Sequence, residues 1–302
     1  MPPEFFHSLL SSLKSSLTEV TVEVNPEDVN LNLLESLKTA GINRLSIGVQ
    51  SFSNKLLKIL ERRHSAEQTL KALEQTFTVF QNVSVDLMFG IPQQTLKDLE
   101  NDLNTIAKFP IKHVSAYLLT LYEGTKFHKT LKQTDLPSEN TIEEMYSLIR
   151  EFLLSKGFNQ YEISNFSISG YECKHNINYW KLRNYEGLGP SAASFKQNVY
   201  EKNVPSITSY ISKLKKGTLP VYEKKTFNKK ELLEIKIAMG LRLTSGINLK
   251  ELNLEEEGKI RKLKELIEEG FLNYQPPILK IESKGYLVSN YLISKVIEAL
   301  LE

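Results

Sequence analysis

The sequence predicts an α/β fold in which a parallel sheet, open or curled into a partial barrel, precedes a smaller α+β domain. Over the first 120 residues, short apolar stretches alternate with amphipathic helical stretches, which is the pattern of right-handed βαβ units. Beyond residue 223 the pattern changes to three helical stretches and a hairpin. We therefore expect a partial (β/α) barrel at 1–165, a connecting region at 166–222 and a winged-helix-like domain at 223–302.

The front half contains four predicted strands, at residues 20–25, 44–50, 83–89 and 113–120. Between them lie helices that repeat apolar residues at helical spacing, and an amphipathic helix at 2–17 comes before the first strand. One of these helices follows Thr95, and Thr95 with Asp98 resembles a capping box. Parallel strands of this kind place ligands at their C-terminal ends.

The back half is expected to contain a helix at 141–155 and a strand at 161–163, which leads into a loop around Cys173. Helices are then expected at 229–243, 249–252 and 257–269, and a hairpin at 279–288 turns at residues 283–285. Three helices and a hairpin raise the question of nucleic-acid binding. The third helix is rich in glutamate, whereas a surface that reads a phosphate backbone is basic, so we expect no nucleic-acid partner.

Composition limits the remaining classes of function. The net charge of +2 is too small to indicate a polyanionic partner, and no apolar run is long enough to span a membrane. One cysteine among 302 residues permits no internal disulfide, so we expect a cytoplasmic protein. The same count means that this chain cannot ligate a [4Fe–4S] cluster, which needs several thiolates.

Polar residues interrupt the predicted strands at a few positions: Glu23 and Asn25 in the first, Gln50 at the end of the second and Asp86 within the third. A carboxylate in a buried parallel strand costs several kcal/mol unless it is paired or bound to a ligand. Glu23 and Asp86 are therefore candidate ligand-binding residues. Two structural alternatives stay open, in which Glu23 pairs with Arg44 and Asp86 caps a neighbouring loop.

The stretch from Gly170 to Trp180 combines the single cysteine, Cys173, with His175, Tyr179 and the single tryptophan. A thiol, an imidazole and two large aromatic rings within eight residues could line a site for a flat ligand or a metal. In the structural alternative, hydrogen bonds close a loop here and Trp180 fills the core.

These motifs together resemble the group of radical S-adenosylmethionine proteins that contains the oxygen-independent coproporphyrinogen oxidases and the haem chaperones. The resemblance covers nearly the whole chain. Its motifs are Thr21-Val22-Glu23-Val24-Asn25-Pro26, Asn43-Arg44-Leu45-Ser46-Ile47-Gly48-Val49-Gln50-Ser51-Phe52, Arg62-Arg63-His64, Val85-Asp86-Leu87-Met88-Phe89-Gly90-Ile91-Pro92, Tyr117-Leu118-Leu119-Thr120, Cys173-Lys174-His175-Asn176-Ile177-Asn178-Tyr179-Trp180, Gly187-Leu188-Gly189-Pro190-Ser191-Ala192 and Gly240-Leu241-Arg242-Leu243 with Gly246-Ile247.

The resemblance implies a partial (β/α) barrel whose strand ends hold S-adenosylmethionine. By matching positions, the residues implied for that cofactor are Glu23, Gln50, Arg62 and Asp86. The segment from Cys173 to Trp180 is similar to the haem chaperone branch. The resemblance there implies His175 as ligand of the haem iron, Tyr179 and Trp180 against the macrocycle, and haem or a porphyrin and a haem-acceptor protein as partners.

The chain departs from the family pattern in two respects. The family's Cys-x3-Cys-x2-Cys loop and Gly-Gly-Thr-Pro segment are missing, so we expect an N-terminally truncated barrel that cannot perform radical chemistry by itself. Ala193 stands where relatives commonly have histidine. Whether the chain is an enzyme stays open. The alternatives are an oxygen-independent coproporphyrinogen III oxidase of porphyrin biosynthesis whose cluster segment is missing, and a non-catalytic scaffold with an open sheet edge.

Overall fold

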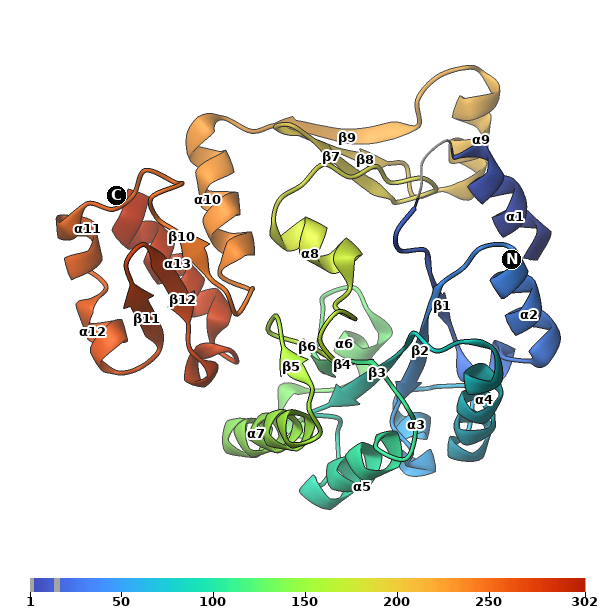
Figure 1. The fold of residues 1–302 in the computed structure, drawn as a ribbon. Helices are drawn as coiled ribbons and strands as arrows, with labels where there is room; N and C mark the ends of the chain where they lie inside the picture. The colour runs from blue at the N-terminus through green and yellow to red at the C-terminus, as the bar shows by residue number, and fades with distance from the viewer. Residues whose placement is uncertain (1–2, 14–16, 302) are drawn as a thin grey trace. The chain divides into compact units, whose positions relative to one another are not determined.

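A computed structural model describes residues 3–13 and 17–301 of the chain (Figure 1). The chain divides into two compact units, Met1–Glu172 and Cys173–Glu302. Each unit is described by itself below. Among the described residues, no helix combines the length and the hydropathy that a membrane crossing requires.

The first unit is built on a six-stranded sheet in the order β1-β2-β3-β4-β6-β5. Its first four strands are parallel: β1 (Thr21–Val24), β2 (Arg44–Gln50), β3 (Val83–Phe89) and β4 (His113–Leu118). Two short antiparallel strands, β6 (Asn165–Ser167) and β5 (Asn159–Gln160), complete the other edge. Within the described residues β1 pairs with β2 alone, so β1 forms an edge of this sheet. The four predicted parallel strands are confirmed.

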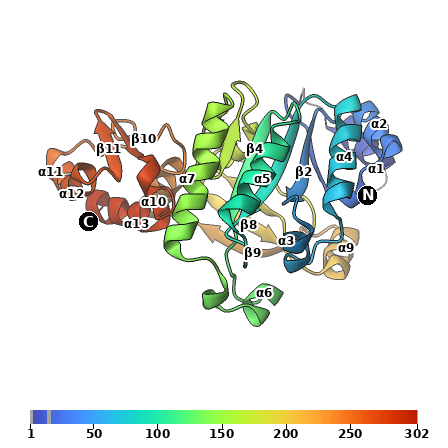
Figure 2. The ribbon, with the colours of Figure 1, turned by 90° about the horizontal axis from the view of Figure 1, so that it is seen from below.

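Helices cover one face of this sheet. Figures 1 and 2 both show α4, α5 and α7 on the same side of the strands. The strand residues of that face are apolar and fully buried, as in Leu45, Ile47, Val83 and Val85, because they pack beneath the helices. The helices of this unit are α1 (Pro3–Ser12), η1 (Pro26–Asp28), α2 (Leu31–Thr39), α3 (Asn54–Ile59), α4 (Ala66–Val79), α5 (Leu96–Ile106), α6 (Lys126–Thr130), η2 (Gln133–Asp135) and α7 (Glu139–Ser155).

Side chains fix the starts of these helices. The capping box predicted at Thr95 and Asp98 is present at the start of α5, and Ser65 with Gln68 forms another at the start of α4. The opening helix, predicted over 2–17, is confirmed over Pro3–Ser12; residues 2 and 14–16 lie outside the described part of the chain.

The strand predicted at 161–163 is wrong. These residues form a turn between β5 and β6, because the carbonyl of Ile163 accepts hydrogen bonds from Tyr146 Oη and Gln160 Nε2, at 2.8 and 3.1 Å. The backbone N–H of Tyr161 donates across the same turn to the carbonyl of Asn165, at 3.2 Å. The apolar residues at 161–163 suggested a strand, but they lie in the tight turn of the β5–β6 hairpin.

The second unit begins with α8 (Lys174–Trp180) and an antiparallel sheet in the order β7-β8-β9. The strands are β7 (Ala193–Lys196), β8 (Val199–Asn203) and β9 (Val221–Thr226), and α9 (Ile207–Lys215) connects β8 to β9. Sequence periodicity did not reveal this sheet. Phe195 of β7 is buried, but β8 is half-buried throughout and β9 is largely exposed, so these strands lack the apolar runs that mark the parallel strands.

The rest of this unit is winged-helix-like, as predicted, with helices around a small antiparallel sheet. The elements are α10 (Lys229–Gly240), β10 (Ile247–Asn248), α11 (Glu257–Arg261), α12 (Lys264–Glu268), β11 (Leu272–Gln275), β12 (Ile278–Ile281), η3 (Ser283–Gly285) and α13 (Ser289–Leu301). The sheet order is β10-β12-β11.

Several boundaries in this part differ from the prediction. The hairpin turns at Pro276-Pro277, not at 283–285, and the residues after β12 form η3 and the unpredicted helix α13. Residues 249–252 form turns and no helix, because Asn248 Oδ1 accepts from the backbone N–H groups of Lys250 and Glu251. The helix predicted at 257–269 is two short helices, which meet at the buried side chain of Leu263.

Candidate functional site

One face of the parallel sheet is polar, and it contains two of the predicted site residues. Strand register pairs Glu23 with Ser46 and Asp86 with Ser115, so alternation of side chains places all four on the same face. The hydroxyl of Ser46 donates to both carboxylate oxygens of Asp86, at 3.2 and 3.3 Å. Register thus brings Asp86 close enough to Glu23 for the two charges to interact, but Glu23 is exposed in the edge strand β1 and is not buried as predicted.

Asp86 is held in an environment that favours its protonated form. Burial is the largest influence and raises the pKa of this carboxyl group; hydrogen bonds from Ser115 and Ser46 oppose that shift, and the nearby charge of Glu23 reinforces it. Asp86 accepts hydrogen bonds from Ser46 in the neighbouring strand β2, so it does not cap a loop. In the described part of the chain, no ion pair joins Glu23 to Arg44, whose Nε is buried without an acceptor.

The same face carries a histidine that sequence reasoning missed. His113 lies in β4 and is 1% exposed; its Nδ1 lies 2.8 Å from Ser84 Oγ, and its Nε2 lies 2.7 Å from Tyr161 Oη. Burial, helped by the charge of Arg44, lowers the pKa of His113 to about 3. The imidazole is therefore neutral at physiological pH. The alternation of His113 and Ser115 with apolar residues was the signal that could have found it.

Gln50, the third predicted residue, closes β2 in an unusual backbone conformation. Its φ is +64° and it is buried, and the register of β2 with β3 shifts at this point. Gly48 leaves room beside it: a Cβ at Gly48 would lie 3.0 Å from Gln50 Nε2 and 3.6 Å from Asn25 Oδ1. The amides of Gln50 and Asn25 thus both lie beside Gly48, at the C-terminal ends of β2 and β1.

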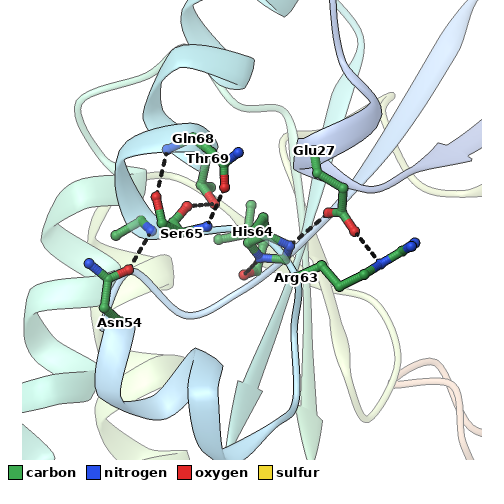
Figure 3. A network of polar contacts seen from close by, with 9 residues as sticks. Glu27, Asn54, Arg63, His64, Ser65, Gln68 and Thr69 are labelled. Carbon is green, nitrogen blue, oxygen red and sulfur yellow. Dashed lines mark hydrogen bonds and ion pairs between the residues drawn. The ribbon is translucent and has the colours of Figure 1, made fainter.

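The fourth predicted residue, Arg62, is exposed in the loop between α3 and α4. The next two residues, Arg63 and His64, connect this loop to Glu27 in the segment after β1 (Figure 3). His64 Nδ1 lies 3.0 Å from Glu27 Oε2, and Arg63 Nε lies 3.4 Å from Glu27 Oε1. The other His64 nitrogen lies 3.3 Å from the carbonyl oxygen of Val49. Among the described residues, no hydrogen bond or ion pair joins Arg62 to Glu23, Gln50 or Asp86.

Glu27 is the acceptor that holds this loop. Its burial would raise the pKa of the carboxyl group, but the hydrogen bonds from its own backbone N–H and from His64, together with the charges of His64 and Arg63, hold that pKa below its usual value. Sequence reasoning noted Arg62-Arg63-His64 as a motif and did not predict its partner. Glu27 is close to the motif only because the chain passes through β2 between them.

The segment predicted as a loop around Cys173 is a helix. Cys173, buried, precedes α8, which carries His175 and Tyr179 one turn apart on the same side. The two rings meet edge-on, with centroids 4.6 Å apart, and Tyr179 meets Tyr185 at 4.5 Å. His175 is exposed and Tyr179 is half-buried. This places an imidazole and a phenol side by side on an accessible helix face.

Trp180 does not join that pair. Its ring lies beneath the guanidinium of Arg242, 5.5 Å from Cζ to the ring centroid. Its Nε1–H is buried and has no acceptor among the residues that the structure describes. Residues 179 and 180 point about 100° apart around a helix, so Tyr179 and Trp180 line different surroundings.

The donor sets differ in how well they fit the implied cofactors. Carboxylates and amides at strand ends suit the amino group and ribose of S-adenosylmethionine, and an exposed imidazole suits haem iron. An iron–sulfur cluster does not fit this chain, since its single cysteine is buried. In addition, no group of three or more His, Cys, Asp or Glu within residues 3–13 and 17–301 could hold a metal ion.

Comparison with known proteins agrees with this fold. Residues 1–106 match the family model described as "Radical SAM superfamily". The chain is 34% identical over 285 residues to the haem chaperone HemW of Bacillus subtilis, covering 91% of this chain and 75% of that protein. It is 31% identical over 287 residues to HemW of Lactococcus lactis, covering 92% and 75% respectively.

A solved structure shows the same fold. The coproporphyrinogen III oxidase HemN of Escherichia coli, described as a radical SAM enzyme, superposes with a TM-score of 0.82 over 98% of this chain and 73% of its own, at 18% identity. That likeness concerns the fold, whereas the HemW relatives share sequence along most of their length. The chain therefore belongs to the radical SAM superfamily, in the group that contains the haem chaperone HemW.

Proposed function

We propose that this protein is a haem-chaperone-like radical SAM homologue that binds haem at α8 and S-adenosylmethionine on the polar face of its parallel sheet. The HemW relatives support the haem assignment by name and by the extent of their similarity. A haem-acceptor protein would be its partner. The oxidase alternative has only a likeness of fold to HemN in its favour.

The observation that carries the haem proposal is the pairing of His175 with Tyr179 on an exposed helix face. An imidazole is the commonest protein ligand of haem iron, and an adjacent aromatic ring provides a contact surface for a flat macrocycle. A series of ring contacts from Tyr179 through Tyr185 to Phe195 and Phe227 holds this side of α8 within the second unit. Ring contacts therefore hold Tyr179 in place, while His175 beside it is exposed.

The polar sheet face supports the S-adenosylmethionine proposal. Glu23 and Asp86 would accept hydrogen bonds from amino and hydroxyl groups, the amide of Gln50 would orient an adjacent polar group, and Arg62 would pair with the cofactor's carboxylate. In radical SAM proteins the bound cofactor supplies a carbon radical after one-electron reduction by a cluster. Because the residues of this chain provide a single thiol, we propose no radical step for them.

Titration of the purified protein with haem tests the proposal. We expect a shifted Soret band in the wild type, and His175→Ala should weaken binding by about tenfold or more because it removes the imidazole that would hold the iron. His128→Ala is the matched control, since His128 is also an exposed helical histidine and lies in the first unit. A wild type without a Soret shift, or a His175→Ala variant with unchanged spectrum and affinity, would contradict the haem assignment.

A further inference from the structure

A cavity of about 500 Å³ in the second unit begins where α8 ends. Its walls include Trp180 at the end of α8, Lys181 and Arg183 just after it, and Lys236 of α10. The turn after α10 closes it: Gly246 has a φ of +68°, and a Cβ there would collide with the carbonyl of Leu279. The cavity is therefore formed within one unit by residues that the haem proposal does not use.

The charge in this cavity is mainly positive. Lys181, Arg183 and Lys236 are exposed, and in the described part of the chain none of them lies in an ion pair. Glu251 is a carboxylate in the same lining, and its Oε1 accepts from Asn248 Nδ2 at 3.0 Å. Three cations against one carboxylate attract an anion, and a cavity concentrates that field more than a flat surface does.

Arg183 is held in place by the end of α8. Leu182 has a φ of +47°, a conformation that a residue with a branched side chain adopts at a cost of about 1 kcal/mol. This turns the chain back, so that the backbone N–H of Arg183 donates to the carbonyl of Asn178 at 2.9 Å. Arg183 Nη1 also donates to Asn178 Oδ1, at 3.1 Å. One bond thus orients the guanidinium toward Asn178, and the other fixes the backbone from which the side chain extends.

Helical spacing places the residue that holds Arg183 on the side of α8 where haem binding is proposed. Residues 175, 178 and 179 are separated by three and four positions, so they share one side of α8. Asn178 thus places Arg183 on the side that carries His175 and Tyr179. Trp180 is one of the lining residues, and its indole Nε1–H is buried without an acceptor in the described residues.

We infer that this cavity receives the carboxylates of a porphyrin whose iron is bound at His175, with Arg183 as the residue that recognises them. The inference rests on the proposed function and extends it from the iron to the rim of the macrocycle. An arginine suits this role because its planar guanidinium can donate two parallel hydrogen bonds to one carboxylate. Lys181 and Lys236 add positive charge to the same cavity.

The test compares haem with haem dimethyl ester, which keeps the iron and the ring and lacks both carboxylate charges. Wild-type protein should bind haem about tenfold more tightly than the ester, the change produced by one charge-assisted hydrogen bond of ordinary strength. Arg183→Gln should remove most of that preference and leave affinity for the ester unchanged. Arg183→Lys should restore part of it, and Asn178→Ala should lose part of it.

Lys215→Gln is the charge-matched control, because Lys215 is exposed on α9 and does not line the cavity. Melting temperatures verify that each variant is folded. Equal affinity of the wild type for haem and its ester would overturn the inference and leave the haem site standing. Equal weakening of both ligands by Arg183→Gln would also overturn it, since Arg183 would then only support α8. A wild type that binds neither ligand would overturn the proposed function itself.

Discussion

Asp102 shows how one buried side chain supports the proposed S-adenosylmethionine site. It is 1% exposed in α5, and its carboxylate accepts from Ser51 Oγ at 2.8 Å and from the backbone N–H of Phe52 at 2.6 Å. These bonds fasten the turn that follows Gln50. Burial raises the pKa of Asp102 to about 6, despite these hydrogen bonds, and the charge of Asp98 adds to the shift.

The raised pKa of Asp102 predicts a pH-dependent contribution to stability. Because the folded state holds this proton more tightly than the unfolded chain, the contribution is fully present below about pH 4 and is lost as the pH rises through about 6. Between pH 4 and 7 the wild type should lose about 2 kcal/mol of unfolding free energy relative to Asp102→Asn. Urea unfolding of both proteins across this range measures the difference. Parallel pH profiles would contradict the assignment.

At the scale of the element, the C-terminal end of β2 combines a left-handed residue, a register shift and a glycine within three positions. Gln50 has the positive φ, and Gly48 leaves the space that its side chain occupies. His64, buried against Glu27 and the carbonyl of Val49, supports the same strand end. Several segments therefore determine where the Gln50 amide lies.

Gly48→Ala should displace the Gln50 amide and leave the overall stability of the protein nearly unchanged. The new Cβ would lie 3.0 Å from Gln50 Nε2, so the amide must move, while the apolar face of β2 stays as it is. We expect affinity for S-adenosylmethionine, measured by calorimetry, to fall about tenfold with a small change in melting temperature. Gly258→Ala is the control, since nothing lies within 4 Å of a Cβ at that position. Unchanged affinity in Gly48→Ala would remove Gln50 from the proposed site.

At the scale of the whole molecule, the winged-helix-like part lacks the excess of positive charge that a nucleic-acid-binding module has. The chain has a net charge of +2, and lysines and arginine of α11 and α12 lie in ion pairs with glutamates of the same segment. We expect no binding of duplex DNA tighter than about 10⁻⁴ M at physiological salt, measured by fluorescence anisotropy. Replacing Glu257, Glu265 and Glu268 by lysine should increase the affinity. Micromolar binding by the wild type, weakening steeply with salt, would contradict the prediction.

Elements that leave a local pattern in the sequence were predicted, and elements without one were missed. The parallel strands and the capping box at Thr95 were predictable because burial on both faces and capping leave local patterns in the sequence. The sheet β7-β8-β9 and helix α13 were missed. The segment around Cys173 was predicted as a loop and is α8, since its polar and aromatic residues give no clear apolar stripe.

The sequence by itself determined the α/β class, the positions of the four parallel strands, the family resemblance and the residues that carry it. Tertiary structure alone decided which of these residues meet. Register brought Ser46 to Asp86 and added His113 to the same face, while Trp180 turned away from Tyr179 toward Arg242. The physical reason is that propensity and periodicity act over a few residues, whereas hydrogen bonds between strands and the turn at Leu182 depend on segments that only folding brings together.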